Sequence, residues 1–368
     1  FFVRLGGAPS PSRGQTLLPR GGAASRAVHH LLVAMGGGGS KGMVKKEAGS
    51  ASVTPTSKSP PATPTGASSS RVGSLKGGCS MLQAKLTSPV GAMRCDPGFG
   101  CDDDDNQDAV LLETLDSGIV VACIFDGHGS SGKLVAEACR SHLIEAVNKH
   151  MPADTKAPGA DWMGACVESL EKHVTSAVSD IAESGSTATI VLYLPASRQL
   201  LAANVGDSKA VIYDGQSAPL TLTVDHYPHV EEERCRIETA GGRVAASDDV
   251  QLGELGEVRV WKGASSAPGL TISRSVGDAV AKTVGVTCNA STKAVEPPGA
   301  AGMGPTRVVI IGSAGIWKIF SPRDLVEVVA REANVEAAAE AVIVEARNRW
   351  EELWQGENTS LVLLALPA

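Results

Sequence analysis

Asp126, Gly127 and His128 bring three groups that can do chemistry into one short turn. Residues 118–124 before the turn are apolar and largely β-branched, which predicts a buried strand, and residues 132–150 after it have apolar side chains at helical spacing. A carboxylate at the end of a rigid strand can hold a metal ion firmly, and an unshielded glycine carbonyl offers a second hard oxygen ligand. The same three residues are also typical of an ordinary tight turn in which the aspartate caps and the histidine is exposed.

Other acidic residues lie beside segments with strand character. Asp108 directly precedes the apolar residues 109–112, so a strand would hold it rigidly, and Asp207 lies in a turn between two such segments. The four consecutive acids at 102–105 are interpreted as a solvated loop, because adjacent side chains cannot all converge on one ion. Asp108 is therefore a better candidate ligand than the acidic run that precedes it.

The remaining pattern predicts an α+β fold with antiparallel sheets. Strands and helices occur in clusters and not in strict alternation, which argues against a doubly wound parallel sheet. The segments with strand character outside the central turn are residues 80–95, 187–194, 199–203, 210–213, 308–312 and 360–366. Those with helical spacing or helix-end signals are residues 132–150, 161–183, 231–240, 322–331 and 335–353.

Composition divides the chain of 368 residues into an extension and one large domain. Residues 1–78 are basic and rich in Gly, Ser and Pro and are predicted to be disordered, whereas residues 79–368 can bury a core. Residues 1–86 contain 11 lysines and arginines against one acid, and the remainder contains 22 against 39. An acidic body does not favour binding of nucleic acid.

The eight cysteines include no Cys-x-x-Cys pair and are interpreted as reduced thiols, which predicts a cytoplasmic or nuclear protein. Residues 1–34 lack Asp and Glu and resemble an organellar transit peptide, or sequence translated upstream of a true start. If translation starts at Met35, Gly36 fits the acceptor of an N-myristoylation pattern, and the lysines that follow would support membrane attachment. The alternative interpretation of this stretch is a flexible glycine-rich linker.

Several motifs follow one another in an order that resembles the type-2C metal-dependent protein serine/threonine phosphatases. In chain order they are Asn106-Gln107-Asp108, Asp126-Gly127-His128-Gly129, Gly185-Ser186-Thr187-Ala188, Asn204-Val205-Gly206-Asp207-Ser208, Ser273-Arg274-Ser275-Val276-Gly277-Asp278, Gly315-Ile316-Trp317 and Gly356-Glu357-Asn358-Thr359. The resemblance implies a four-layer α-β-β-α sandwich, with two antiparallel sheets flanked by helix pairs and a two-ion Mg²⁺ or Mn²⁺ site in a cleft at one end. We expect phosphorylated proteins as partners, and a monomer.

The resemblance also implies which residues hold the metal ions. Asp126 would bridge both ions, the Gly127 carbonyl would be a ligand, and Asp108 would support the second ion. Asp207 lies where the family can hold a weaker third ion, and Glu357 stands in place of the family's final aspartate ligand.

Two residues have implied catalytic roles. His128 would protonate the leaving oxygen of the substrate, a transfer that suits a group whose pKa lies near neutrality. Arg94 is the only candidate near the first acidic motif for the family's phosphate-binding arginine. Asp278 is interpreted as structural, as is Asp225-His226.

The chain departs from the family pattern around one of the two ions. Ala314 occupies the position of a metal-binding carboxylate, Lys318 replaces an acid, and Glu357 is one methylene longer than the usual aspartate. Two ions are expected, with the binding of one weakened by Ala314. Two functions stay open, a metal-dependent phosphatase with weakened activity and a pseudophosphatase that binds a phosphoprotein or a kinase. Residues 245–266 are the predicted substrate-selecting segment.

Overall fold

The computed structural model describes residues 82, 86–98, 100, 106–154, 158–247, 256–296 and 306–367. The predicted tail at residues 1–78, which includes Gly36, and the acidic run at residues 102–105 lie outside the described residues. Among the helices that are described, none is both long enough and apolar enough to cross a bilayer.

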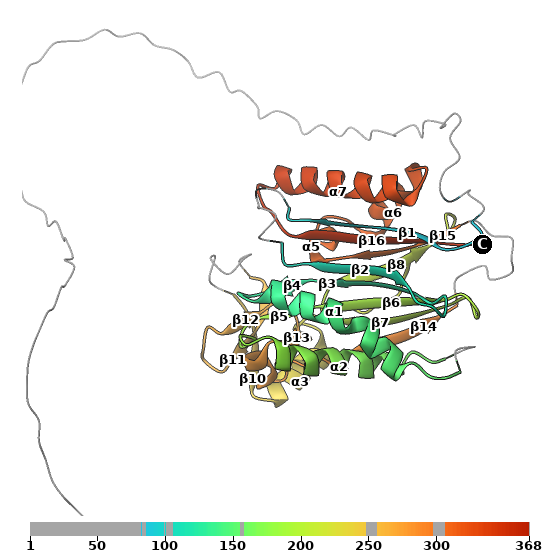
Figure 1. Ribbon diagram of the computed structural model, residues 1–368. Coiled ribbons are helices and arrows are strands. Elements are labelled where there is room, and N and C mark those ends of the chain that lie inside the picture. The colour runs from blue at the N-terminus through green and yellow to red at the C-terminus, as the bar shows by residue number, and fades with distance from the viewer. Residues whose placement is uncertain are drawn as a thin grey trace, which may run out of the picture. The chain divides into compact units, whose positions relative to one another are not determined.

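Two five-stranded sheets form the centre of the domain (Figure 1). The strand order of the first sheet is β1 (Val90–Asp96), β16 (Thr359–Leu366), β15 (Arg307–Gly312), β8 (Lys209–Tyr213) and β9 (Leu220–Thr221). The order of the second sheet is β14 (Ser291–Val295), β7 (Gln199–Val205), β6 (Ala188–Leu194), β3 (Val120–Phe125) and β2 (Ala109–Thr114). Every neighbouring pair in the two sheets is antiparallel, which confirms the predicted fold class.

A pair of helices covers the outer face of each sheet. Helices α1 (Gly132–His150) and α2 (Trp162–Ala177) share a core with the second sheet, and α6 (Pro322–Arg331) and α7 (Val335–Glu352) share one with the first. Figure 1 shows the resulting order of layers, with α7 on one side of the stacked sheets and α1 and α2 on the other. The predicted α-β-β-α sandwich is therefore confirmed.

Strand β3 shows why the central strands are apolar at every position. Successive side chains of a strand point to opposite faces of the sheet. Odd-numbered residues of β3, such as Cys123, join the core beneath α1 and α2, whereas even-numbered residues, such as Ala122, join the core between the two sheets. Both faces are buried, so each position must be apolar, and a fully buried aliphatic side chain contributes about 1.5–3 kcal/mol.

Two small sheets lie at the end of the sandwich that carries the turn at Asp126. One consists of β4 (Gly127–His128), β5 (Gly185–Ser186) and β13 (Val276–Gly277). The other consists of β10 (Gly242–Ala246), β11 (Val258–Lys262) and β12 (Pro268–Leu270), which pack with α3 (Glu231–Thr239) and α4 (Ala279–Lys282) around their own apolar cluster.

Helix α2 ends at Ala177, although helix was predicted to residue 183. After this point the chain extends, and the carbonyls of Ile181 and Ala182 accept hydrogen bonds from the N–H groups of Ala279 and Val280. These carbonyls therefore accept hydrogen bonds from the first two residues of α4. Local helical spacing cannot reveal such a tertiary contact. The first strand also begins later than predicted, at Val90.

Candidate active site

Asp126 lies between β3 and β4, where hydrogen bonds fix both its backbone and its carboxylate. Its N–H donates to Thr187 Oγ1 at 3.1 Å, and its carbonyl accepts from the N–H of Thr187 at 2.9 Å. Its Oδ2 accepts a hydrogen bond from the N–H of Ala314 at 3.0 Å, at the first residue of the short helix α5 (Ala314–Trp317). The carboxylate is thus held at the meeting point of three segments that are far apart in sequence.

Gly127 follows in a position that excludes any side chain. A Cβ at this residue would lie 2.5 Å from the carbonyl oxygen of Gly132 and 2.6 Å from that of Gln107. The close packing of these backbone segments explains the glycine independently of any metal ion, and it leaves the predicted role of its carbonyl as a ligand untested.

Asp108 precedes β2 and is fully buried at both carboxylate oxygens, neither of which has a hydrogen-bond partner in the described part of the chain. Burial raises the pKa of Asp108 to about 6, and the charge of Glu357 adds to the effect, although the hydroxyls of Ser360 and Ser313 oppose it. An ionised carboxylate in such a place is costly unless a cation neutralises it.

Asp207, in the turn between β7 and β8, and Glu357, before β16, complete the group of acids. Burial raises the pKa of Asp207 to about 7, with a further contribution from the charge of Asp126. Burial likewise raises the pKa of Asp126 well above its usual range, and the charges of Asp108 and Glu357 add to this. Glu357 differs from the others because its Oε1 lies 2.5 Å from Lys318 Nζ.

His128 forms a hydrogen-bonded pair with Asp278. His128 Nε2 lies 2.7 Å from Asp278 Oδ2, and the aspartate side chain is only 2% exposed. Burial lowers the pKa of His128, but the charge and hydrogen bond of Asp278 raise it by more, and the net shift is upward. The imidazole is therefore both fixed in orientation and favoured in its protonated form.

The pairing of Asp278 with His128 was not predicted from the sequence, which favours a structural interpretation of Asp278. Its partner is 150 positions away, and only the pairing of β5 with both β4 and β13 brings the two together. Asp278 adopts a left-handed backbone conformation with φ of 51°, which aspartate tolerates better than most residues. Gly185 is required beside it, because a Cβ there would collide with the Asp278 carboxylate.

Contacts from α2 and from Lys282 support the backbone beside Asp278. Glu171 on α2 accepts hydrogen bonds from the N–H of Gly277 at 2.9 Å and from Lys282 Nζ at 2.7 Å. The same ammonium donates to the carbonyl of Gly277. These contacts fix the residue before Asp278, so α2 contributes to the position of the histidine without touching it.

The prediction for Arg94 is corrected by the structure. Arg94 lies on β1, and its Nε pairs with Glu340 of α7 at 3.2 Å, on the helix-covered face of the first sheet. Ala92, two residues earlier on the same face, packs in the core beneath α7. The alternation of the strand therefore turns Arg94 away from the pocket. The arginine that does line the pocket is Arg259 on β11.

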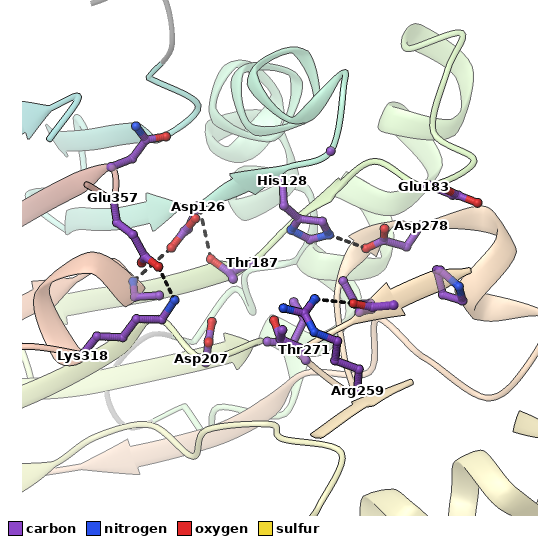
Figure 2. A pocket seen from close by; sticks show the side chains of 17 residues that line it. Asp126, His128, Glu183, Thr187, Asp207, Arg259, Thr271, Asp278, Lys318 and Glu357 are labelled. Carbon is purple, nitrogen blue, oxygen red and sulfur yellow. Dashed lines mark hydrogen bonds and ion pairs between the residues drawn. The ribbon is translucent and has the colours of Figure 1, made fainter. Parts of the chain in front are cut away.

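A cavity of about 400 Å³ is lined by Asp126, Asp207, Glu357, the His128–Asp278 pair and two cations, and Asp108 lies outside this lining. Figure 2 shows Asp126, Glu357 and Lys318 on one side of it and His128 with Asp278 on another, with Arg259 entering from the small β10–β12 sheet. The guanidinium of Arg259 is held by the Gly269 carbonyl at 2.6 Å and by Glu257 at 2.5 Å.

The donor set fits a hard divalent cation at part of the site. Carboxylate and carbonyl oxygens are the ligands that Mg²⁺ and Mn²⁺ prefer, and the two oxygens of Asp108, without a hydrogen-bond partner in the described ranges, need a positive partner. Among the described residues, however, no three His, Cys, Asp or Glu side chains converge closely enough to hold an ion by themselves. A bound ion would therefore keep several water ligands, as Mg²⁺ commonly does.

Comparison with known proteins identifies the family. Residues 104–351 match the model of the family described as protein phosphatase 2C. Probable protein phosphatase 2C 61 of Arabidopsis thaliana is 31% identical over 259 residues, covering 67% of this chain and 74% of that protein. Probable protein phosphatase 2C 12 of Oryza sativa subsp. japonica is 29% identical over 295 residues, covering 67% and 73%.

A solved structure agrees in fold. Serine-threonine phosphatase 2C from Toxoplasma gondii superposes with a TM-score of 0.61 at 17% identity, covering 78% of this chain and 98% of that one. The relatives are named as phosphatases, which favours the enzyme over the binding-module hypothesis. This chain belongs to the protein phosphatase 2C family of metal-dependent serine/threonine phosphatases.

Proposed function

We propose that this chain hydrolyses phosphoserine and phosphothreonine esters of proteins in the cavity between Asp126 and His128, with Mg²⁺ or Mn²⁺ as its cofactor. The observation that carries the proposal is the buried carboxylate of Asp108, for which the described residues offer no hydrogen-bond partner. The neighbouring pocket holds the His128–Asp278 pair. A purely structural pocket would pair or neutralise these acids.

Asp126, Asp108 and the Gly127 carbonyl are the groups that would hold a divalent cation. When bound, such a cation lowers the pKa of a coordinated water and offsets the negative charge of the phosphoryl group. The opposite part of the site is weakened, because Ala314 offers a methyl group where a carboxylate is expected and Glu357 is already paired with Lys318.

His128 would supply the proton that hydrolysis requires. A new bond forms between phosphorus and the oxygen of water, the bond to the serine or threonine oxygen breaks, and that leaving oxygen takes a proton from the imidazolium. Nε2 of His128 is engaged by Asp278, and Figure 2 shows the other ring nitrogen turned away from Asp278 toward the cavity. Asp278 therefore keeps the ring charged and points its free N–H at the substrate.

The substrate segment around the phosphorylated residue would occupy a second hollow that continues from the cavity. This hollow of about 1070 Å³ shares Asp207, Arg259 and Lys318 with the first one. Its outer wall includes Tyr227 and Leu353, the latter 56% exposed. An open hollow with apolar and charged groups suits an extended polypeptide better than a small metabolite.

The predicted substrate-selecting segment at residues 245–266 contributes to this hollow. Of its described residues, Glu257, Val258 and Arg259 lie in the wall. We therefore assign sequence preference around the phosphoresidue to this segment. The myristoylation of Gly36, the monomeric state and the cytoplasmic or nuclear location remain predictions.

The test is turnover of para-nitrophenyl phosphate and of a phosphothreonine peptide by the purified full chain, with Mn²⁺ or Mg²⁺ and with EDTA. We expect metal-dependent release of phosphate that Asp126→Asn lowers by at least ~10³-fold, because this carboxylate would be a ligand of the bound metal. Asp116→Asn, at an exposed turn, is the matched control. Activity that survives EDTA, or an equally active Asp126→Asn variant, would overturn the proposal.

A further inference from the structure

The acids of the pocket differ in what already occupies their oxygens. Asp126 Oδ2 accepts a hydrogen bond from the Ala314 N–H at 3.0 Å, and Glu357 Oε1 lies 2.5 Å from Lys318 Nζ. The two donors lie at the two ends of α5, since Ala314 is its first residue and Lys318 directly follows its last residue. On this side of the pocket the protein itself supplies the positive partners.

Asp108 shows the opposite arrangement. Its two carboxylate oxygens are buried and have no hydrogen-bond partner in the described part of the chain. The cation that Asp108 requires must therefore come from solution, whereas Glu357 is paired with a cation that is covalently part of the chain.

We propose that the Lys318 ammonium takes the place of one of the two divalent cations, so that this chain binds a single divalent ion, at the Asp108 side. The inference rests on the proposed function, because a charge-compensating lysine has a purpose only if the pocket binds metal and phosphate.

The surroundings of Lys318 support this assignment. Figure 2 shows its nitrogen inside the pocket beside Glu357, with Asp207 facing the same space. Lysine carries a positive charge at neutral pH, and an ammonium held beside Glu357 at 2.5 Å repels a second divalent ion.

Loss of the ligand at Ala314 and gain of the lysine then have one physical explanation. A carboxylate at position 314 would stabilise a second ion next to α5. Without that carboxylate, the Lys318 ammonium beside Glu357 supplies one positive charge in place of the second ion. The ammonium can also attract a phosphoryl oxygen, although a single charge does so less strongly than a divalent ion.

The first measurement is the number of Mn²⁺ ions bound per chain, by calorimetric titration and by electron paramagnetic resonance of the loaded protein. We expect one Mn²⁺ per chain and the six-line spectrum of an isolated ion. The double variant Ala314→Asp/Lys318→Asp restores two carboxylates and is expected to bind two ions, with a spectrum broadened by coupling between them.

The second measurement distinguishes a Lys318 charge that replaces a divalent ion in catalysis from one that only repels such an ion. Lys318→Met keeps much of the length of the side chain and removes its charge. We expect its turnover at saturating Mn²⁺ to fall at least tenfold while its affinity for Mn²⁺ stays equal or rises, and Lys318→Arg to retain more turnover than Lys318→Met. Lys149→Met, at the exposed end of α1, is the control, and the melting temperature of each variant reports its folding.

Two results would overturn the inference and leave the proposed function standing. These are an active wild-type enzyme with two coupled Mn²⁺ ions, and a folded Lys318→Met variant whose turnover is unchanged or increased. A wild-type chain that binds no Mn²⁺ and releases no phosphate would instead reject the proposed function, and the inference with it.

Discussion

Two buried carboxylates, Glu233 on α3 and Asp108 beside the pocket, have opposite surroundings. Glu233 is 4% exposed and accepts hydrogen bonds from Ser273 Oγ at 2.5 Å, Arg274 at 2.6 Å and Arg236 at 2.9 Å. Burial alone would raise the pKa of Glu233, but the hydrogen bonds from these three donors lower it by more. The resulting pKa is about 2. Asp108 has no arginine as a hydrogen-bond partner in the described structure, and its pKa is raised to about 6 although the hydroxyls of Ser360 and Ser313 oppose the rise.

The difference separates acids that stabilise the fold from acids that cost stability and are retained for chemistry. At Glu233 the desolvation of the charge is offset by two guanidinium groups, so the ionised form belongs to the folded state. At Asp108, Asp126 and Asp207 burial and mutual repulsion favour the neutral form. Uncompensated acids of this kind are a physical marker of a site that awaits a cation.

The largest expected effect on stability comes from removing the paired acid. Glu233→Gln should lower the free energy of unfolding by about 3 kcal/mol, because two arginines lose their partner. The melting temperature should fall by roughly 5–10 °C, while turnover per folded molecule is unchanged.

Calorimetry or thermal fluorescence measures this effect, with the adjacent exposed Glu232→Gln as the control. Its pH dependence has a defined sign. The contribution of Glu233 is complete above the ordinary pKa of 4.5 and is lost as the pH falls toward 2. If the wild type and Glu233→Gln have the same free energy of unfolding at pH 7, the hydrogen bonds of Glu233 to the two arginines do not stabilise the fold.

The next effect concerns the histidine pair. Asp278→Asn should lower kcat by about 10- to 100-fold with little change in KM, because asparagine keeps the left-handed backbone but removes the charge that favours the imidazolium. The pKa of His128 falls, so activity should be lost at a lower pH than in the wild type.

The full profile of kcat against pH measures this shift. A merely structural role of Asp278 would lower kcat equally at every pH and would leave the alkaline limb in place. That outcome would contradict the assignment of Asp278 as the residue that positions and charges His128.

The smallest effect is a gain in stability from removing an unpaired acid. With EDTA present, Asp207→Asn should stabilise the fold by about 1 kcal/mol at pH 8, by less at pH 5 and by nothing measurable below pH 3.8. The pKa of Asp207 is about 7 in the folded state against an ordinary 3.8, so its favourable contribution is complete below 3.8 and is lost as the pH rises from 3.8 through 7. Equal melting temperatures for the two proteins at pH 8 would remove Asp207 from the group of uncompensated acids.

Residue patterns alone predicted the features of the fold that depend on local spacing. Helices α1 and α6 have the predicted bounds, and α7 ends one residue before its predicted end. The apolar runs also predicted buried strands, because a two-sided core leaves no polar position in them. The ordered motifs predicted the family and the acids that meet at the pocket.

Contacts between distant segments could not be predicted in the same way. The direction of the Arg94 side chain, toward α7 and not toward the pocket, depends on the register of β1 in the sheet and not on residue type. The pairs His128–Asp278 and Lys318–Glu357 each join residues from different elements. The charge reversal at Lys318 was visible in the sequence, but its partner was not.

The position of β16 in the first sheet has a consequence for biosynthesis. This strand lies between β1 and β15, and its residues pair with Val90–Asp96 on one side and Arg307–Gly312 on the other. The sheet cannot close until residues 359–366 have left the ribosome, and contacts of such long sequence separation form slowly. A nascent chain interrupted before this strand would expose the apolar edge of β15 and would lack Glu357, so incomplete chains carry neither a finished core nor a working pocket.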